Sequence, residues 1–123
     1  MGSPCVQSDD MGKLYAEIEQ ADLIVFASPL YFFGLSAQIK CVIDRLYPYY
    51  VENSVRQVKG KECALLVSCA TDEPGELKGS TYDIMTKYMQ WQDTGHVIAF
   101  EVDKKGEVRD TEYIEQARNL GAQ

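Results

Sequence analysis

Hydrophobic positions along the chain first recur at the spacing of a helix and then form a continuous apolar run. The first helix is predicted from apolar side chains at the spacing of one helical face. These are Met11, Leu14, Tyr15 and Ile18. Asp9 is the expected N-cap. The run Leu23–Ala27 is apolar throughout, which is typical of a parallel strand covered by helices on both faces. We expect it to end at Ser28-Pro29, because proline has no N–H for the ladder.

The same alternation continues to the C-terminus. In chain order, the pattern predicts a helix capped at Ser36 and reaching Leu46, a strand over 64–69, a helix over about 77–92, a strand over 97–100, a turn over 104–107 and a helix over 113–120. Parallel strands joined by right-handed helical crossovers form a doubly wound α/β sheet. We therefore expect one domain over 1–123, with three recognisable strands where such sheets usually have five or more.

Composition and charge narrow the function classes. Hydrophobic residues make up 46% and charged residues 25%, as in ordinary globular proteins. With 19 acidic and 12 basic side chains the net charge is −7, which disfavours nucleic acid and anionic membranes as partners. Since no apolar stretch reaches membrane-spanning length and no signal peptide is evident, we expect a cytoplasmic protein.

The four cysteines do not predict a metal site. Cys5, Cys41, Cys63 and Cys69 form no C-x-x-C pair, so neither a zinc site nor a thioredoxin-type pair is indicated. We expect Cys41, Cys63 and Cys69 to be small core side chains, because each lies in an apolar run. His96 is expected to be a partly exposed strand residue.

Two loops follow the carboxyl ends of predicted strands, where open α/β sheets bind ligands. They are Ser28–Ser36 and Ala70–Gly75. The first contains the consecutive aromatic residues Tyr31–Phe33. Exposed aromatic rings are unfavourable in water, so these rings should pack on the protein or cover a flat ligand. Gly34 would allow a ligand to approach the backbone closely.

The sequence around this loop resembles a known family signature. The matching segments are Ser28-Pro29-Leu30-Tyr31-Phe32-Phe33-Gly34, Ser36-Ala37-Gln38-Ile39-Lys40 and Ile43-Asp44-Arg45. They resemble the flavodoxin-like NAD(P)H-dependent FMN reductases and the related iron–sulfur flavoproteins, and the similarity extends over nearly the whole chain. The resemblance implies a flavodoxin-like fold, FMN as cofactor and NAD(P)H as co-substrate.

The resemblance also implies which residues contact the flavin. Those of the first loop are Ser28, Pro29, Leu30, Tyr31, Phe32 and Gly34, and those of the second are Ala70, Thr71, Asp72 and Gly75. In this family hydride passes from nicotinamide to flavin, so we name no catalytic side chain. We interpret Lys40, Asp44 and Arg45 as ion-pairing residues that tie one helix to its neighbours.

Full-length relatives begin with a strand and a phosphate-binding loop that this sequence does not show. We therefore expect weak or absent FMN binding by this chain alone. Cys5 is a single thiol where the iron–sulfur relatives have a cysteine cluster, and one thiolate cannot hold a cluster. Without a preceding strand, Leu23–Ala27 should be an exposed apolar edge that pairs with another copy, giving a homodimer or a higher homo-oligomer.

Two functions remain open from the sequence. The first is an FMN-dependent NAD(P)H oxidoreductase of the flavin reductase type, which passes hydride from a nicotinamide to flavin and on to an acceptor. The second is a non-catalytic flavodoxin-like interaction module that no longer binds FMN. The retained aromatic loop favours the first, and the missing phosphate loop favours the second for this polypeptide alone.

Overall fold

One four-stranded sheet organises the protein. The structure is a computed structural model that describes residues 5–51, 58–72 and 80–122. The strands are β1 (Leu23–Tyr31), β2 (Gly34–Leu35), β3 (Glu62–Ser68) and β4 (Gln92–Ala99). Their order in the sheet is β2-β1-β3-β4, with β1, β3 and β4 parallel and β2 antiparallel to β1. The predicted parallel α/β sheet is confirmed.

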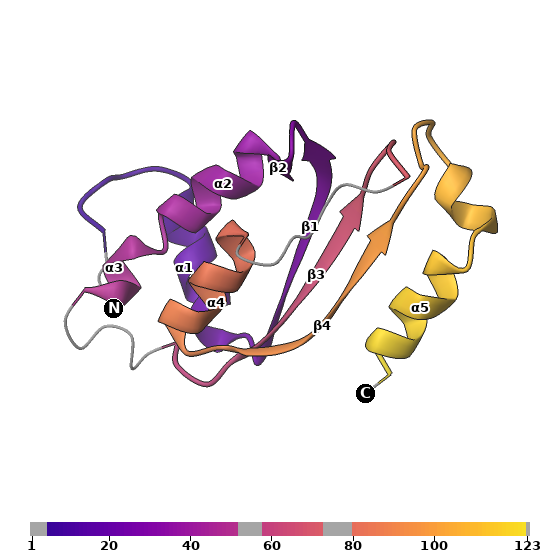
Figure 1. Ribbon diagram of the computed structural model, residues 1–123. Helices are drawn as coiled ribbons and strands as arrows, with labels where there is room; N and C mark the ends of the chain where they lie inside the picture. The colour runs from indigo at the N-terminus through magenta and orange to yellow at the C-terminus, as the bar shows by residue number, and fades with distance from the viewer. Residues whose placement is uncertain (1–4, 52–57, 73–79, 123) are drawn as a thin grey trace.

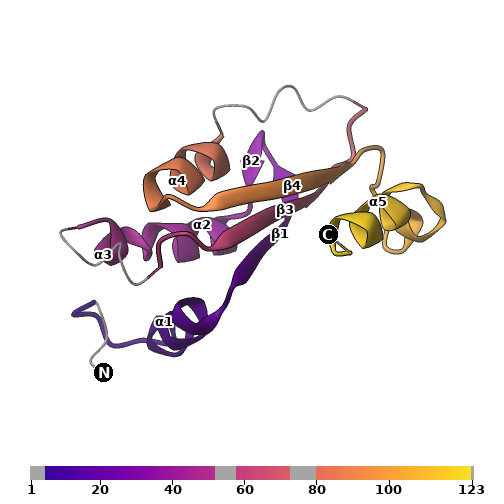
Figure 2. The same cartoon turned by 90° about the horizontal axis from the view of Figure 1, so that it is seen from below.

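Helices lie on both faces of this sheet (Figures 1 and 2). On one face are α1 (Met11–Gln20), α2 (Ala37–Asp44), α3 (Tyr47–Tyr50) and α4 (Thr81–Met89). On the other are the 3-10 helix η2 (Glu107–Asp110) and α5 (Tyr113–Leu120). Helix α5 approaches β4 so closely that a Cβ added to Gly95 would lie 2.9 Å from Cδ1 of Leu120. None of the described helices combines the length and apolar character needed to cross a bilayer.

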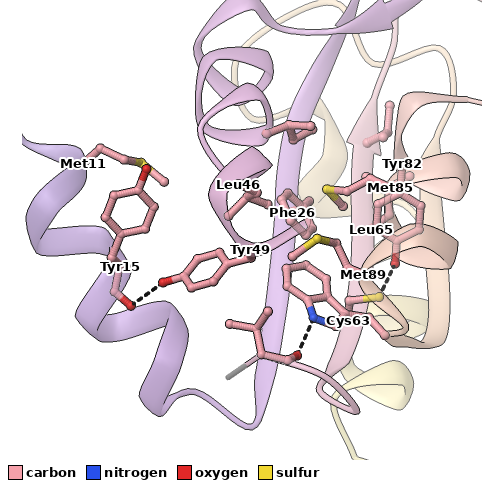
Figure 3. Close-up of a cluster of buried hydrophobic side chains, with 14 residues drawn as sticks. Met11, Tyr15, Phe26, Leu46, Tyr49, Cys63, Leu65, Tyr82, Met85 and Met89 are labelled. Carbon is pink, nitrogen blue, oxygen red and sulfur yellow. Dashed lines mark hydrogen bonds between the residues drawn. The ribbon is translucent and has the colours of Figure 1, made fainter. Parts of the chain in front are cut away.

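The main core lies between the sheet and helices α1, α2 and α4 (Figure 3). Its aromatic side chains keep their polar atoms bonded, as burial requires. The Tyr82 hydroxyl donates to Asp93 Oδ1 at 2.9 Å, and Trp91 Nε1 donates to the Val58 carbonyl at 2.7 Å. Burial raises the pKa of Tyr82 far above its usual value, so this hydroxyl remains a donor at every physiological pH.

Strand β1 is longer than predicted. It continues through Pro29, which pairs in register with Ser68, and ends at Tyr31. The Asp22 carbonyl accepts from the Glu62 N–H on β3, so even-numbered residues direct their backbone groups towards β3 and odd-numbered ones away from it. Pro29 therefore faces the other side, where its missing N–H removes no bond to β3. Strand β2, which the sequence did not predict, returns along that side.

The third predicted helix ends earlier than expected, and the third predicted strand begins earlier. Helix α4 ends at Met89 because Gln90 adopts a left-handed conformation with φ of 56°, and β4 begins at Gln92 instead of residue 97. The first residues of β4 are polar because they lie on an exposed edge strand. A strand prediction based on apolar runs therefore does not include them. The predicted helix start at residue 77 lies outside the described residues. The segment after α2, expected to be a loop, contains the short helix α3.

The cysteine predictions are partly wrong. Cys63 and Cys69 are buried as expected, whereas Cys41 is exposed. Cys41 lies on the outer side of α2, because Ile39, Val42 and Ile43 point towards the core. Within the described residues, no group of three His, Cys, Asp or Glu side chains could hold a metal ion.

Ion pairs fix α2 as predicted. Lys40 pairs with Asp44 on the helix surface, and Arg45 pairs with Asp9 beside the start of α1. The hydrogen bond from the Arg45 guanidinium lowers the pKa of Asp9. Asp10 occupies the N-cap position of α1, one residue later than predicted, but Asp9 Oδ1 accepts the hydrogen bond from the Met11 N–H at 3.1 Å.

The outer edge of β1 is open over most of its length. In the part of the chain that the structure describes, no strand pairs with Leu23–Pro29 on the side away from β3. Leu23 and Val25, whose side chains face the α5 side of the sheet, are 44% and 49% exposed. The predicted exposed apolar edge is confirmed, and its pairing with another copy stays a prediction.

Candidate functional site

A hairpin at the carboxyl end of β1 carries the predicted aromatic residues. Tyr31 pairs with Gly34 across the turn formed by Phe32 and Phe33. Both turn residues have left-handed backbone conformations, with φ of 45° and 65°. A two-residue hairpin turn favours these angles, but glycine and asparagine adopt them much more readily than phenylalanine. The left-handed conformation costs an L-residue with a side chain about 1–2 kcal/mol.

The aromatic rings of this turn point into solvent. Tyr31, Phe32 and Phe33 are 65%, 96% and 79% exposed. The rings of Phe32 and Phe33 meet edge to face, with their centroids 5.4 Å apart. Of the two predicted alternatives, packing on the chain's own surface is therefore wrong for these described rings, and a surface for a flat ligand remains.

Two buried serines close the base of the hairpin. The Ser28 Oγ accepts a hydrogen bond from the Ser36 N–H at 2.9 Å and donates to the Pro29 carbonyl at 2.8 Å. The Ser36 Oγ in turn accepts from the Ile39 N–H at 3.5 Å and caps α2, as the sequence predicted. The hairpin and the start of α2 are thus bonded to each other through side chains.

The other predicted residues of this loop point in different directions. Leu30 is half-buried and packs against the core, and Pro29 lines a groove on the α5 face of the sheet. At Gly34, an added Cβ would meet only the Tyr31 carbonyl oxygen, at 4.0 Å. None of its described neighbours therefore excludes a side chain at Gly34, and its lack of one leaves free space beside the turn.

The second predicted loop lies next to the hairpin. Since Pro29 pairs with Ser68, the exposed residues Ala70, Thr71 and Asp72 continue from β3 beside the end of β1. The Thr71 carbonyl accepts from the Glu101 N–H at 3.1 Å, which ties this loop to the segment after β4. Gly75 lies outside the described residues.

Sequence reasoning missed two features of this region. Phe33 was not among the predicted contacts, although its exposure and backbone match those of Phe32; the run of aromatic letters was the available signal. A groove of about 420 Å³ also lies between the sheet and α5, with apolar walls that include Leu66, Val97 and Ile114. This groove depends on where α5 packs, which no local pattern reports.

Comparison with known proteins shows related sequences. A family profile described as NADPH-dependent FMN reductase matches residues 2–104. The chain is 32% identical over 118 residues to an iron-sulfur flavoprotein of Archaeoglobus fulgidus, which covers 96% of this chain and 51% of that protein. It is 37% identical over 90 residues to an FMN-dependent NADH:quinone oxidoreductase of Bordetella parapertussis, covering 68% of this chain and 40% of that protein. The chain thus spans about half or less of these relatives.

Solved structures with the same fold also match. The Trp repressor binding protein from Bacillus subtilis aligns with a TM-score of 0.79 and 21% identity, covering 90% of this chain and 75% of that one. The general stress protein 14 from Treponema denticola, solved in complex with FMN, aligns with a TM-score of 0.67 and 20% identity, covering 94% and 71%. The fold predicted from the sequence, a flavodoxin-like α/β sheet, is confirmed.

Proposed function

The chain belongs to the NADPH-dependent FMN reductase family, and we propose that it forms part of an FMN-dependent NAD(P)H oxidoreductase. In this proposal hydride passes from a nicotinamide to the flavin and from there to an acceptor. The relative from Bordetella parapertussis, an FMN-dependent NADH:quinone oxidoreductase, supports a redox function of this kind.

The observation that carries the proposal is the hairpin turn. Phe32 and Phe33 hold unfavourable backbone angles while their rings face solvent, so neither packing nor backbone preference explains these residues. The turn lies at the carboxyl end of β1, where open α/β sheets bind their ligands. A flat aromatic cofactor would cover the rings and remove their contact with water.

The residues present fit the isoalloxazine part of FMN. Tyr31, Phe32 and Phe33 would provide apolar contact with the ring system, and Gly34 would leave room for it. Ala70, Thr71 and Asp72 would border the ligand from the neighbouring strand, with Gly75 as a further predicted contact. When bound, FMN supplies the hydride chemistry, and the chain's own residues orient the ring and exclude water from one side of it.

The assembly and location of the protein belong to the same proposal. The open edge at Leu23–Ala27 supports pairing with another copy, as a homodimer or a higher homo-oligomer. We also place the protein in the cytoplasm, where the thiols of Cys63 and Cys69 would remain reduced.

Titration of the purified chain with FMN tests the proposal. We propose that this chain alone binds FMN weakly, so the flavin absorbance bands should shift only at high FMN concentration. The bound flavin should then accept hydride from NADPH or NADH, measured as loss of nicotinamide absorbance. Replacing Phe32 by alanine should weaken FMN binding about three- to tenfold, the equivalent of an aromatic contact worth about 0.5–1.5 kcal/mol.

Tyr88→Ala is the matched control, because Tyr88 is an exposed aromatic residue near the end of α4 and outside the proposed site. This variant should bind FMN like the original chain. An absorbance spectrum that added FMN leaves unchanged would contradict the proposal and favour the non-catalytic interaction module. Equal weakening by Phe32→Ala and Tyr88→Ala would contradict the placement of the flavin at the hairpin.

A further inference from the structure

We infer that Ser28 is a positioning residue of the flavin site: its buried hydroxyl bonds the aromatic hairpin to the start of α2 and does not contact the ligand. This inference rests on the proposed function, and it differs from the flavin contact that the resemblance implies for Ser28. Within the hairpin, it assigns the ring contacts to the tip.

The first argument is that the Ser28 hydroxyl is already engaged at both its donor and its acceptor side. It accepts from the Ser36 N–H at 2.9 Å and donates to the Pro29 carbonyl at 2.8 Å. Ser28 is only 6% exposed, and its backbone lies within the β1 ladder to β3. The hydroxyl therefore has no proton left to donate to a ligand, and its burial keeps a ligand away from its remaining lone pair.

The second argument concerns what these bonds hold in place. Ser36 follows β2 directly and caps α2, so its N–H marks the point where the hairpin becomes a helix. The hydrogen bond from Ser36 to Ser28 spans eight residues and closes the loop that contains the strained turn at Phe32 and Phe33. The position of the aromatic rings at the end of β1 therefore depends on this hydrogen bond.

The third argument is the local chemistry of Pro29. Proline has no N–H, so the backbone of β1 offers β2 no donor at this position. The side chain of Ser28 satisfies the Pro29 carbonyl, and the same oxygen atom takes up the Ser36 N–H. The hydroxyl thus bridges the Ser36 N–H and the Pro29 carbonyl, two groups that a continuous antiparallel ladder would have joined directly.

The test compares Ser28→Ala with Ser28→Thr, which keeps the hydroxyl in a residue that strands favour. Ser28→Ala leaves the buried Ser36 N–H without its acceptor, so exchange of this amide with solvent should accelerate about tenfold or more. FMN binding should weaken about tenfold in Ser28→Ala, and Ser28→Thr should restore both values. Amide exchange is followed by NMR without FMN, and binding by absorbance titration.

Thr94→Val is the matched control, because Thr94 Oγ1 donates to the Cys63 carbonyl at 3.0 Å at the opposite end of the sheet. It should leave both Ser36 exchange and FMN affinity unchanged. Unchanged exchange at Ser36 in Ser28→Ala would overturn the positioning role. So would equal loss of FMN binding in Ser28→Ala and Ser28→Thr, or in Thr94→Val.

The two proposals fail in distinguishable ways. If the original chain binds no FMN, the proposed function fails while the exchange of the Ser36 amide still decides whether Ser28 holds the hairpin. If Ser28→Ala does not fold, Ser28→Cys provides the comparison, because a thiol of similar size is a weaker hydrogen-bonding group. In Ser28→Cys, exchange of the Ser36 amide should be up to about tenfold faster than in the original chain. Its FMN affinity should be lower by a factor of up to about three to ten.

Discussion

The aromatic side chains of the core and those of the hairpin tip are the same residue types used in opposite ways. Under the sheet, Phe26 is buried and its ring lies 5.8 Å from that of Tyr82 and 6.2 Å from that of Trp91. At the hairpin, Phe32 and Phe33 contact each other but project into solvent. The core rings stabilise the fold, whereas the hairpin rings contribute almost no burial.

The backbone sharpens this difference. Phe26 lies in a regular strand, where β-branched and aromatic residues are favoured. Phe32 and Phe33 occupy left-handed positions that disfavour them. Residues that are unfavourable for folding at the place where they occur indicate a role other than folding, and the role that we propose here is contact with the flavin.

The largest expected effect is a difference in stability between variants of the core and variants of the hairpin tip. Phe26→Ala should lower the free energy of unfolding by about 3–5 kcal/mol, because it leaves a cavity beside Tyr82 and Trp91. Phe32→Ala should change it by less than about 0.5 kcal/mol. Urea unfolding followed by circular dichroism measures both. Similar losses in the two variants would show that the hairpin rings pack on the protein in solution.

A smaller effect of opposite sign should come from correcting the turn. Replacing Phe32 by asparagine and Phe33 by glycine gives the sequence that two-residue hairpin turns prefer. We expect the free energy of unfolding to rise by about 1 kcal/mol, because the left-handed strain is relieved. FMN affinity should fall in the same variant. If thermal and urea unfolding show that this double variant is no more stable than the original chain, the turn does not store strain.

The smallest effect concerns the far end of α2, where Arg45 meets Asp9 away from the hairpin. The bond from Arg45 lowers the pKa of Asp9 below 3.8 in the folded protein. The stability it contributes is therefore present above about pH 4 and is lost as the pH falls through the lower folded pKa. Asp9→Asn should be less stable than the original chain at neutral pH, and the difference should shrink in acid.

Unfolding at a series of pH values measures this effect, with Asp10→Asn as the control. Asp10 pairs with Lys13 on the surface, where both side chains are largely exposed to water, so the loss of this pair should have no measurable effect on stability. FMN affinity should be unchanged in both variants. A pH-independent difference for Asp9→Asn would show that the ion pair does not account for its contribution.

The sequence predicted the three parallel strands and most of the helices because their apolar positions repeat at regular spacings. It was less successful where an element carried polar residues or depended on a neighbour. The start of β4 at Gln92 is polar, and β2 exists only because the hairpin folds back along β1. The extension of β1 through Pro29 depends on which side of the strand faces β3, and composition cannot report this.

For the site, the sequence by itself determined that aromatic residues gather after the first strand, since the order of residues is sufficient to place them at the carboxyl end of a parallel strand. Only the tertiary structure decided which of them face solvent and which pack inward. It turned Leu30 towards the core, exposed Phe32 and Phe33, and engaged the Ser28 hydroxyl with Ser36. The physical reason is that exposure and hydrogen bonding depend on what lies opposite a residue across the sheet, and those neighbours come from distant parts of the chain.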